Sequence, residues 1–345
     1  MKFYKQLFFI LFINPFFVCS QTYNNNYFDY HTQINKAETF LLKENNLDSC
    51  FYYYDKAFKE FDFIFVKDLV NAAQIAKLNN RDYEKYIIQG FKNGLKINHL
   101  ESYPIFKDVV NKLKKDKQIS QLYNENRKVY LKRIDLEYLN SIYDFVVLDQ
   151  KYREQRRDYF NSKISYNLNK LSKWINTKGF PSDKLLGISD STIFRENKSL
   201  KNDIISREQK TPSKFKFYTS IKEESFSQYF LDSFIMTSGL CFFKENNKDL
   251  LLKEIKKGNL HPKDVAYFCD AAYFNSKMNG LDRCGTTKVC PLFTNTFDDQ
   301  NEFNIYKANE VRREFYIIDY EIDKLKEDYQ AKNNLRLFSG NHNQR

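Results

Sequence analysis

The stretch FYYYDKAFKEFDFIFVKDLVNAA, residues 51–73, decides the fold predicted for this chain. Apolar side chains recur in it every three or four positions, first from Phe51 to Phe61 and then from Val66 to Ala73. This spacing places the apolar residues on one face of a helix. The stretch therefore predicts two amphipathic helices that are separated near Asp62.

The same spacing continues along the rest of the chain. A third segment carries Tyr83, Ile87 and Phe91, and polar interruptions at residues 45–46 and 79–80 mark the ends of the helices on either side. Glycine and proline are scarce, at 9 and 6 residues, which favours long helices over a sheet with many turns. We therefore expect a mostly α fold, with a short stack of helical hairpins followed by an α-helical domain.

The N-terminal half contains an internal match. Tyr53-Tyr54 with Ala57-Phe58-Lys59 corresponds to Tyr86-Ile87 with Gly90-Phe91-Lys92, at an offset of about 33 residues. This pattern resembles tetratricopeptide repeats, with units at roughly 30–62 and 63–95 in a domain of residues 30–133. The resemblance implies a curved stack whose groove holds a peptide or protein partner. The alternative is that so short a stack only supports the domain that follows.

Residues 134–331 are predicted to form a second helical domain, and residues 332–345 a disordered tail. The second domain carries a series of short motifs, in this order: Asp149-Gln150-x-x-Arg153, Gly179-Phe180-Pro181, Leu185-Leu186-Gly187, Gly258 to Pro262, Ala266-Tyr267-Phe268-x-Asp270, Gly285-Thr286 and Asn309-Glu310-x-Arg312-Arg313. In these motifs the domain resembles a family of bacterial helical domains of unknown function that are often exported. The resemblance implies no established reaction.

Polar residues of these motifs could converge on one pocket, where arginine side chains would hold a carboxylate or a phosphate. The candidates are Asp149, Gln150, Arg153, Asp270, Gly285, Thr286, Arg312 and Arg313. Two simpler explanations stay open. Asp149 and Arg153 are four positions apart and could pair with each other on a helix, and the two neighbouring arginines could belong to a solvated face.

The chain departs from the pattern of that family at three places. No histidine lies between residues 100 and 260, Ala271 follows Asp270, and the family's Tyr-Gly-Thr-Gln string reads Cys284-Gly285-Thr286-Thr287. Without a side chain that titrates near neutral pH, general acid and base chemistry is weakened. We therefore expect a protein that binds a peptide or protein partner without a cofactor. The alternative is a hydrolase or transferase with a polar Asp/Arg pocket.

Residues 1–20 have the pattern of a secretory signal peptide. Two lysines precede an apolar run, residues 7–18, and Val18-Cys19-Ser20 offers a cleavage site. The run is too short for a helix that spans a bilayer, which needs about twenty residues. We expect an exported protein, periplasmic or extracellular, with no transmembrane segment after cleavage. A lipoprotein modified at Cys19 is the alternative, although residues 16–18 are bulky where lipid attachment requires small side chains.

Export would allow the cysteines to form disulfides. Cys284 and Cys290 enclose a short loop, which favours a bridge between them, and Cys241 with Cys269 is a second possible pair. Cys50 is expected to be a small buried apolar residue. No metal site is expected, because no pair of cysteine or histidine ligands has the two-residue gap of a zinc knuckle and the four histidines are scattered.

The net charge of +11 raises the question of a nucleic-acid partner. Lys, Asn, Ile, Phe and Tyr are all abundant, as AT-rich codons alone would produce. The positive charges also form no long block, since Asp116 interrupts the lysines of residues 112–117. No nucleic-acid partner is expected.

Overall fold

The structure is a computed structural model, and it describes residues 23–142, 170–188, 247–270, 293 and 304–338, with positions 172 and 268 left out. These residues form a mostly α fold in which no strand occurs. The predicted fold class is therefore confirmed. The predicted signal peptide lies outside the described residues.

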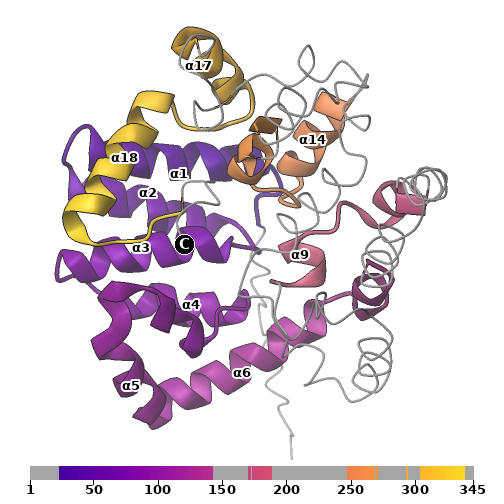
Figure 1. Cartoon of the computed structure of the whole chain (residues 1–345). Coiled ribbons are helices and arrows are strands. Elements are labelled where there is room, and N and C mark those ends of the chain that lie inside the picture. The colour runs from indigo at the N-terminus through magenta and orange to yellow at the C-terminus, as the bar shows by residue number, and fades with distance from the viewer. Residues whose placement is uncertain are drawn as a thin grey trace, which may run out of the picture.

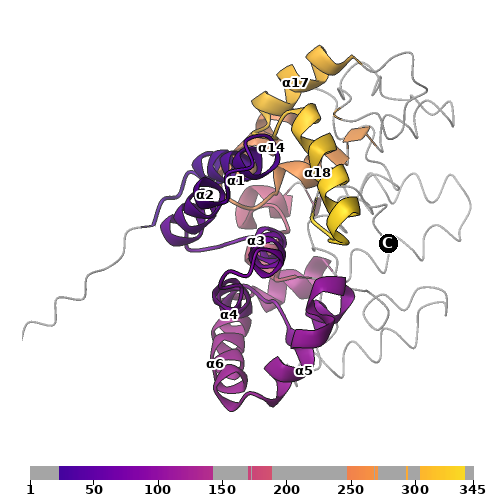
Figure 2. The ribbon, with the colours of Figure 1, turned by 90° about the vertical axis from the view of Figure 1, so that its left-hand side faces the viewer.

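The described helices of the N-terminal half follow one another closely. They are α1 (Tyr27–Leu42), α2 (Leu47–Glu60), α3 (Val66–Leu78), α4 (Glu84–Lys92), the short 3-10 helices η1 (Ile97–Ser102) and η2 (Pro104–Phe106), α5 (Lys107–Lys115) and α6 (Lys117–Arg133). Helix α1 packs on α2, α3 on α4, and α4 on α6 (Figure 1). Seen from the side, the first four helices form a column (Figure 2).

The breaks between these helices lie where the polar residues predicted them. Asn45 and Asn80 adopt positive φ angles of 50° and 53°, which asparagine tolerates better than most residues. The side chain of Asn46 then accepts a hydrogen bond from the Ser49 N–H at 2.9 Å and caps the start of α2. Asparagine therefore both ends one helix and begins the next.

The described helices of the C-terminal half are α9 (Asp183–Leu186), α14 (Asn247–Lys256), α17 (Ile305–Glu314) and α18 (Tyr320–Asn333). Helices α14 and α18 both pack on α1, and α17 packs on α18 (Figure 1). Figure 2 shows α18 alongside the column of N-terminal helices. Helices α14 and α18 are thus held against α1.

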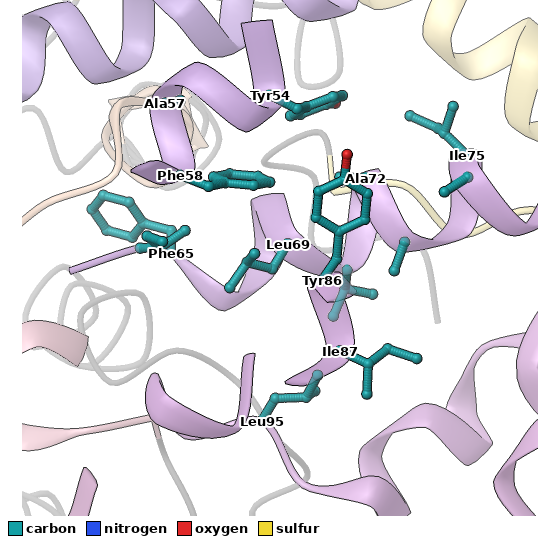
Figure 3. Close-up of a cluster of buried hydrophobic side chains, with 14 of the residues drawn as sticks. Tyr54, Ala57, Phe58, Phe65, Leu69, Ala72, Ile75, Tyr86, Ile87 and Leu95 are labelled. Carbon is teal, nitrogen blue, oxygen red and sulfur yellow. The ribbon is translucent and has the colours of Figure 1, made fainter. Parts of the chain in front are cut away.

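The buried apolar side chains form two clusters. One joins α1 to α5 and includes Phe58 of α2, Leu69 of α3 and Ile87 of α4 (Figure 3). The other extends from Tyr130 of α6 to Ile317 beyond α17. The first cluster also contains Leu335 and Leu337, so it is not confined to the N-terminal half. The predicted division into domains at residues 133 and 134 stays a prediction.

The helix pairs α1–α2 and α3–α4 overlap the two predicted repeat units of residues 30–62 and 63–95, although α1 begins before residue 30. Their first helices begin at Tyr27 and Val66, and their second helices at Leu47 and Glu84. These starts are spaced more widely than the sequence match of about 33 residues. The resemblance to tetratricopeptide repeats therefore stays a prediction.

None of the helices in the described residues combines the length and the apolar character that crossing a membrane requires.

Candidate functional site

Helix α3 is buried on all sides, and one of its faces is polar. Leu69, Ala72 and Ile75 point into the apolar cluster with α2 and α4 (Figure 3). Asn71 and Gln74, three residues apart, lie on another face and are 1% and 0% exposed. A buried amide side chain requires hydrogen-bond partners, because an unpaired one loses its bonds to water without compensation.

The partners of both amides belong to an extended piece of backbone, residues 335–338, which we call the C-terminal segment. Gln74 accepts from the Arg336 N–H at 3.0 Å and donates to the Arg336 carbonyl at 2.8 Å. Asn71 accepts from the Phe338 N–H at 2.8 Å and donates to the Phe338 carbonyl at 3.4 Å. Each amide therefore pairs with both backbone groups of one residue, as a neighbouring strand would.

The two spacings fit each other. Side chains three apart on a helix are separated by about 5–6 Å, and alternate residues of an extended chain by about 6.6 Å. Asn71 and Gln74 can therefore reach every second residue of an extended peptide. In Figure 1 the chain leaves α18, turns back and runs along α3.

Helix α18 holds the other side of the C-terminal segment. Gln330 accepts from the Leu335 N–H with its carbonyl and from the Leu337 N–H with its side chain, at 3.0 and 2.6 Å. Together with the bonds to α3, every backbone N–H of the segment is bound. Leu335 and Leu337 are 6% and 1% exposed and belong to the first apolar cluster, which joins α1 to α5. The segment therefore fills a site between α3 and α18.

Residues 332–338, the first part of the predicted disordered tail, lie in helix α18 and the C-terminal segment, and residues 339–345 lie outside the described residues. Helix α18 continues to Asn333, and Asn334 reverses the chain in the left-handed conformation, with φ at 52°. The segment that follows is held by side chains of α3 and α18. Its order depends on hydrogen bonds from elements far away in the sequence, which the local composition of the tail does not reveal.

Beneath the C-terminal segment lies a group of buried charges. Glu38 of α1 accepts hydrogen bonds from Lys263, at 2.9 Å, and from Lys326 of α18. Asp323 pairs with Arg312 and lies 3.5 Å from Lys263. Lys326 also donates to the Phe338 carbonyl at 2.7 Å. The network thus links α1, α17, α18 and the C-terminal segment.

Two lysines share one glutamate in this network, and their pKa values diverge. Burial lowers the pKa of Lys326 to about 8, against the opposing attraction of Glu38. Burial also lowers the pKa of Lys263, but Glu38 and Asp323 outweigh it and raise that pKa above its usual value. Both ammonium groups are buried within ion-pair distance of Glu38, and a buried ammonium group needs a carboxylate partner.

Two histidines lie beside these charges, and both are 2% exposed. The rings of His31 and His261 are 4.9 Å apart. His261 Nδ1 accepts from the Lys263 N–H at 3.1 Å, and its Nε2 lies 3.4 Å from an Asp68 oxygen. Burial lowers the pKa of each histidine well below its usual value. Both rings are therefore neutral at pH 7.

The structure brings together two residues of the predicted polar pocket. Asp270 accepts from the Phe293 N–H at 2.7 Å, and Arg312 donates to the Phe293 carbonyl at 2.9 Å. Both side chains are 1% exposed and hold the backbone in place. Arg313 instead lies on the surface and pairs with Asp319 at 2.7 and 2.9 Å. The other candidates, Asp149, Gln150, Arg153, Gly285 and Thr286, lie outside the described residues.

The cysteine predictions are tested in part. Cys284, Cys290 and Cys241 lie outside the described residues, and the described residues contain no disulfide bond. Cys50 is a fully buried thiol, as expected, and burial raises its pKa. Cys269 is buried in the second apolar cluster. The described part of the chain holds no group of three or more His, Cys, Asp or Glu side chains placed to bind a metal.

An open groove of about 390 Å³ lies between α2 and α4. Its floor is apolar and includes Phe58 and Ile64. At its rim, Asp55 accepts hydrogen bonds from Lys85 at 2.8 Å and from the Tyr86 hydroxyl at 2.8 Å. These rim charges are paired within the protein, whereas the polar face of α3 binds a peptide backbone directly.

Comparison of the chain with protein-family models, with curated proteins and with solved structures gives no match. Both family resemblances therefore stay predictions.

Proposed function

We propose that this chain is an interaction protein that binds an extended peptide of a partner protein between α3 and α18. The observation that carries the proposal is the pairing of Asn71 and Gln74 with the backbone of Arg336 and Phe338. Bonds to backbone groups are available from any extended peptide, so the same amides can hold a segment of another protein.

The surroundings of the two amides support this function. A partner peptide would find side-chain amide donors and acceptors on α3 and a side-chain acceptor on Gln330 of α18, the same groups that the C-terminal segment now uses. It would also find an apolar wall that now covers Leu335 and Leu337. Fixed donors and acceptors lower the entropic cost of binding an extended ligand.

Export is part of the proposal, with the partner in the periplasm or outside the cell. The support is the signal-peptide pattern of residues 1–20. Mass spectrometry of the mature protein, before and after reduction, tests it. We expect an N-terminus at Gln21 and at least one disulfide, whereas a lipid-modified start at Cys19 would contradict the proposed processing.

Peptide binding is tested with a fluorescein-labelled peptide of residues 333–342. The full chain carries Leu335→Ser and Leu337→Ser, which removes the apolar anchors of its own segment and makes the site accessible. We call this the release variant. Fluorescence anisotropy should show saturable binding, and adding Asn71→Ala and Gln74→Ala should weaken it by about tenfold or more, because four hydrogen bonds are lost.

Gln89→Ala in the release variant is the matched control. Gln89 is a half-buried glutamine of α4 that donates to the Phe58 carbonyl and does not contact the C-terminal segment. It should leave peptide binding unchanged. A second measurement uses the wild-type chain: excess unlabelled peptide should increase hydrogen exchange at residues 335–338. Absence of binding in the folded release variant, with no change in exchange, would refute the proposed function.

A further inference from the structure

The partly buried side chain of Phe338 lies between Lys67 and His261 in the proposed peptide site. The ammonium group of Lys67 lies 4.1 Å from the centre of its ring. The ring of His261 meets it nearly edge-on, with centroids 5.0 Å apart and an interplanar angle of 81°. A cation over the face of an aromatic ring is attracted to its π electrons.

Lys67 and His261, which contact the ring, are each held in place by a second interaction. Lys67 forms an ion pair with Asp264 at 2.6 Å, and this aspartate is 1% exposed. The orientation of His261 is fixed by the hydrogen bond from the Lys263 N–H to its Nδ1. A cation and an imidazole held in position in this way select the shape and charge of the side chain between them.

The other side chains of the C-terminal segment alternate. Leu335 and Leu337 are buried in the apolar cluster, whereas Arg336 is exposed and its guanidinium donates to the Ser102 carbonyl. Successive side chains of an extended chain point to opposite sides. The site therefore recognises two apolar residues separated by one residue that can be polar. The aromatic position follows directly.

We propose that the partner peptide carries the pattern apolar–any–apolar–aromatic, and that Lys67 and His261 select the aromatic residue. This inference rests on the proposed function. The chain's own segment carries the same pattern and is tethered at an effective concentration on the order of millimolar, so it competes with a partner for the site. A partner therefore binds by displacing residues 335–338.

The experiment compares three labelled peptides of residues 333–342 on the folded release variant. One keeps the natural sequence, and the others carry Phe338→Leu or Phe338→Tyr. Phe338→Leu should raise Kd by about threefold to tenfold, because the attraction of the ring to the cation is lost. Phe338→Tyr should bind within about twofold of the natural peptide, since its ring keeps the π face.

Substitutions of Lys67 then test whether this residue causes the preference for an aromatic side chain at position 338. In the release variant, Lys67→Met should bring the affinities of the natural and Phe338→Leu peptides within about twofold, whereas Lys67→Arg, which keeps a cation, should preserve the difference. The wild-type chain should bind the natural peptide about tenfold or more weakly than the release variant, because its own segment competes.

The outcomes separate the two proposals. Equal affinity of the natural and Phe338→Leu peptides, with binding still lost on Asn71→Ala and Gln74→Ala, would overturn the aromatic selection and leave the proposed function standing. Equal affinity of the wild-type chain and the release variant would overturn the competition by the C-terminal segment. Failure of every peptide to bind the folded release variant would overturn the proposed function itself.

Discussion

The two faces of α3 are equally buried but are covered in different ways. Leu69 and Ala72 are covered by neighbouring helices of the same stack, through contacts that require only apolar surface. Asn71 and Gln74 are covered by a separate extended segment, through directed hydrogen bonds. Apolar contacts are non-directional and grow with the area buried, whereas amide pairs need a backbone in one position. The polar face is therefore suited to a ligand that exchanges, and the apolar face to a permanent core.

The largest expected effect comes from the charges that support the polar face. Glu38→Ala leaves the ammonium groups of Lys263 and Lys326 buried without their shared carboxylate. The free energy of unfolding should fall by about 3–5 kcal/mol, the usual cost of breaking a buried ion pair. Urea denaturation measures this change.

Glu101→Ala is the control for that prediction. Glu101 pairs with Lys114 at 2.5 Å, but both side chains are substantially exposed. Its loss should cost less than about 1 kcal/mol, because solvent screens the pair. Equal losses at Glu38 and Glu101 would contradict the view that the buried network holds α1 to α18.

The apolar face is tested by Leu69→Ala, which should lower the free energy of unfolding by about 3 kcal/mol. Leu69 is 0% exposed among α2, α3 and α4, so its truncation leaves a cavity. Leu325→Ala, at a leucine of α18 that is 40% exposed, should cost less than about 0.5 kcal/mol. If Leu69→Ala also released residues 335–338 before global unfolding, the two faces would not be independent.

The sequence predicts one of these faces far better than the other. The recurrence from Val66 to Ala73 identifies the apolar face, and the asparagines at residues 45–46 and 79–80 locate the helix ends. The sequence does not single out Asn71 and Gln74, because their partners lie far along the chain. Two amide residues spaced by three in an otherwise apolar stretch of α3 are the available signal, and they do not identify a partner.

The sequence has the same limit for the two arginines of the predicted polar pocket. Arg312 and Arg313 are adjacent in one motif, and the sequence gives no reason to separate them. In the structure Arg312 is buried against the Phe293 carbonyl, while Arg313 is exposed beside Asp319. Which of two neighbouring arginines points inward depends on how α17 packs on α18, and this tertiary contact leaves no local pattern.

The next effect is a dependence of stability on pH. Burial lowers the pKa of His31 and of His261 in the folded chain, so the unfolded chain binds more protons below about pH 6.5. Stability should therefore fall as the pH falls from 6.5 to 5, by up to about 1.4 kcal/mol per pH unit for each histidine.

His31→Phe isolates one of the two contributions. The groups that face His31 are His261, Asp68 and Lys263, and all of them remain in the variant. Burial raises the pKa of Asp68, which acts in the opposite direction, so the comparison with wild type is needed. Urea denaturation between pH 5 and 7 should give a smaller slope for the variant. An unchanged slope would show that His31 is not buried in its neutral form.

The smallest effect on global stability is expected at the polar face itself. Gln74→Ala removes two hydrogen bonds to Arg336, and the released backbone groups can bind water once the C-terminal segment detaches. The free energy of global unfolding should fall by only about 1 kcal/mol, while hydrogen exchange at residues 335–338 should rise by about tenfold or more, because local opening precedes global unfolding. If Gln74→Ala lowered the free energy of unfolding as much as Leu69→Ala, with no selective increase in hydrogen exchange at residues 335–338, both faces would be parts of one permanent core. The distinction matters for function, since a peptide site must open at a cost that leaves the helical stack folded.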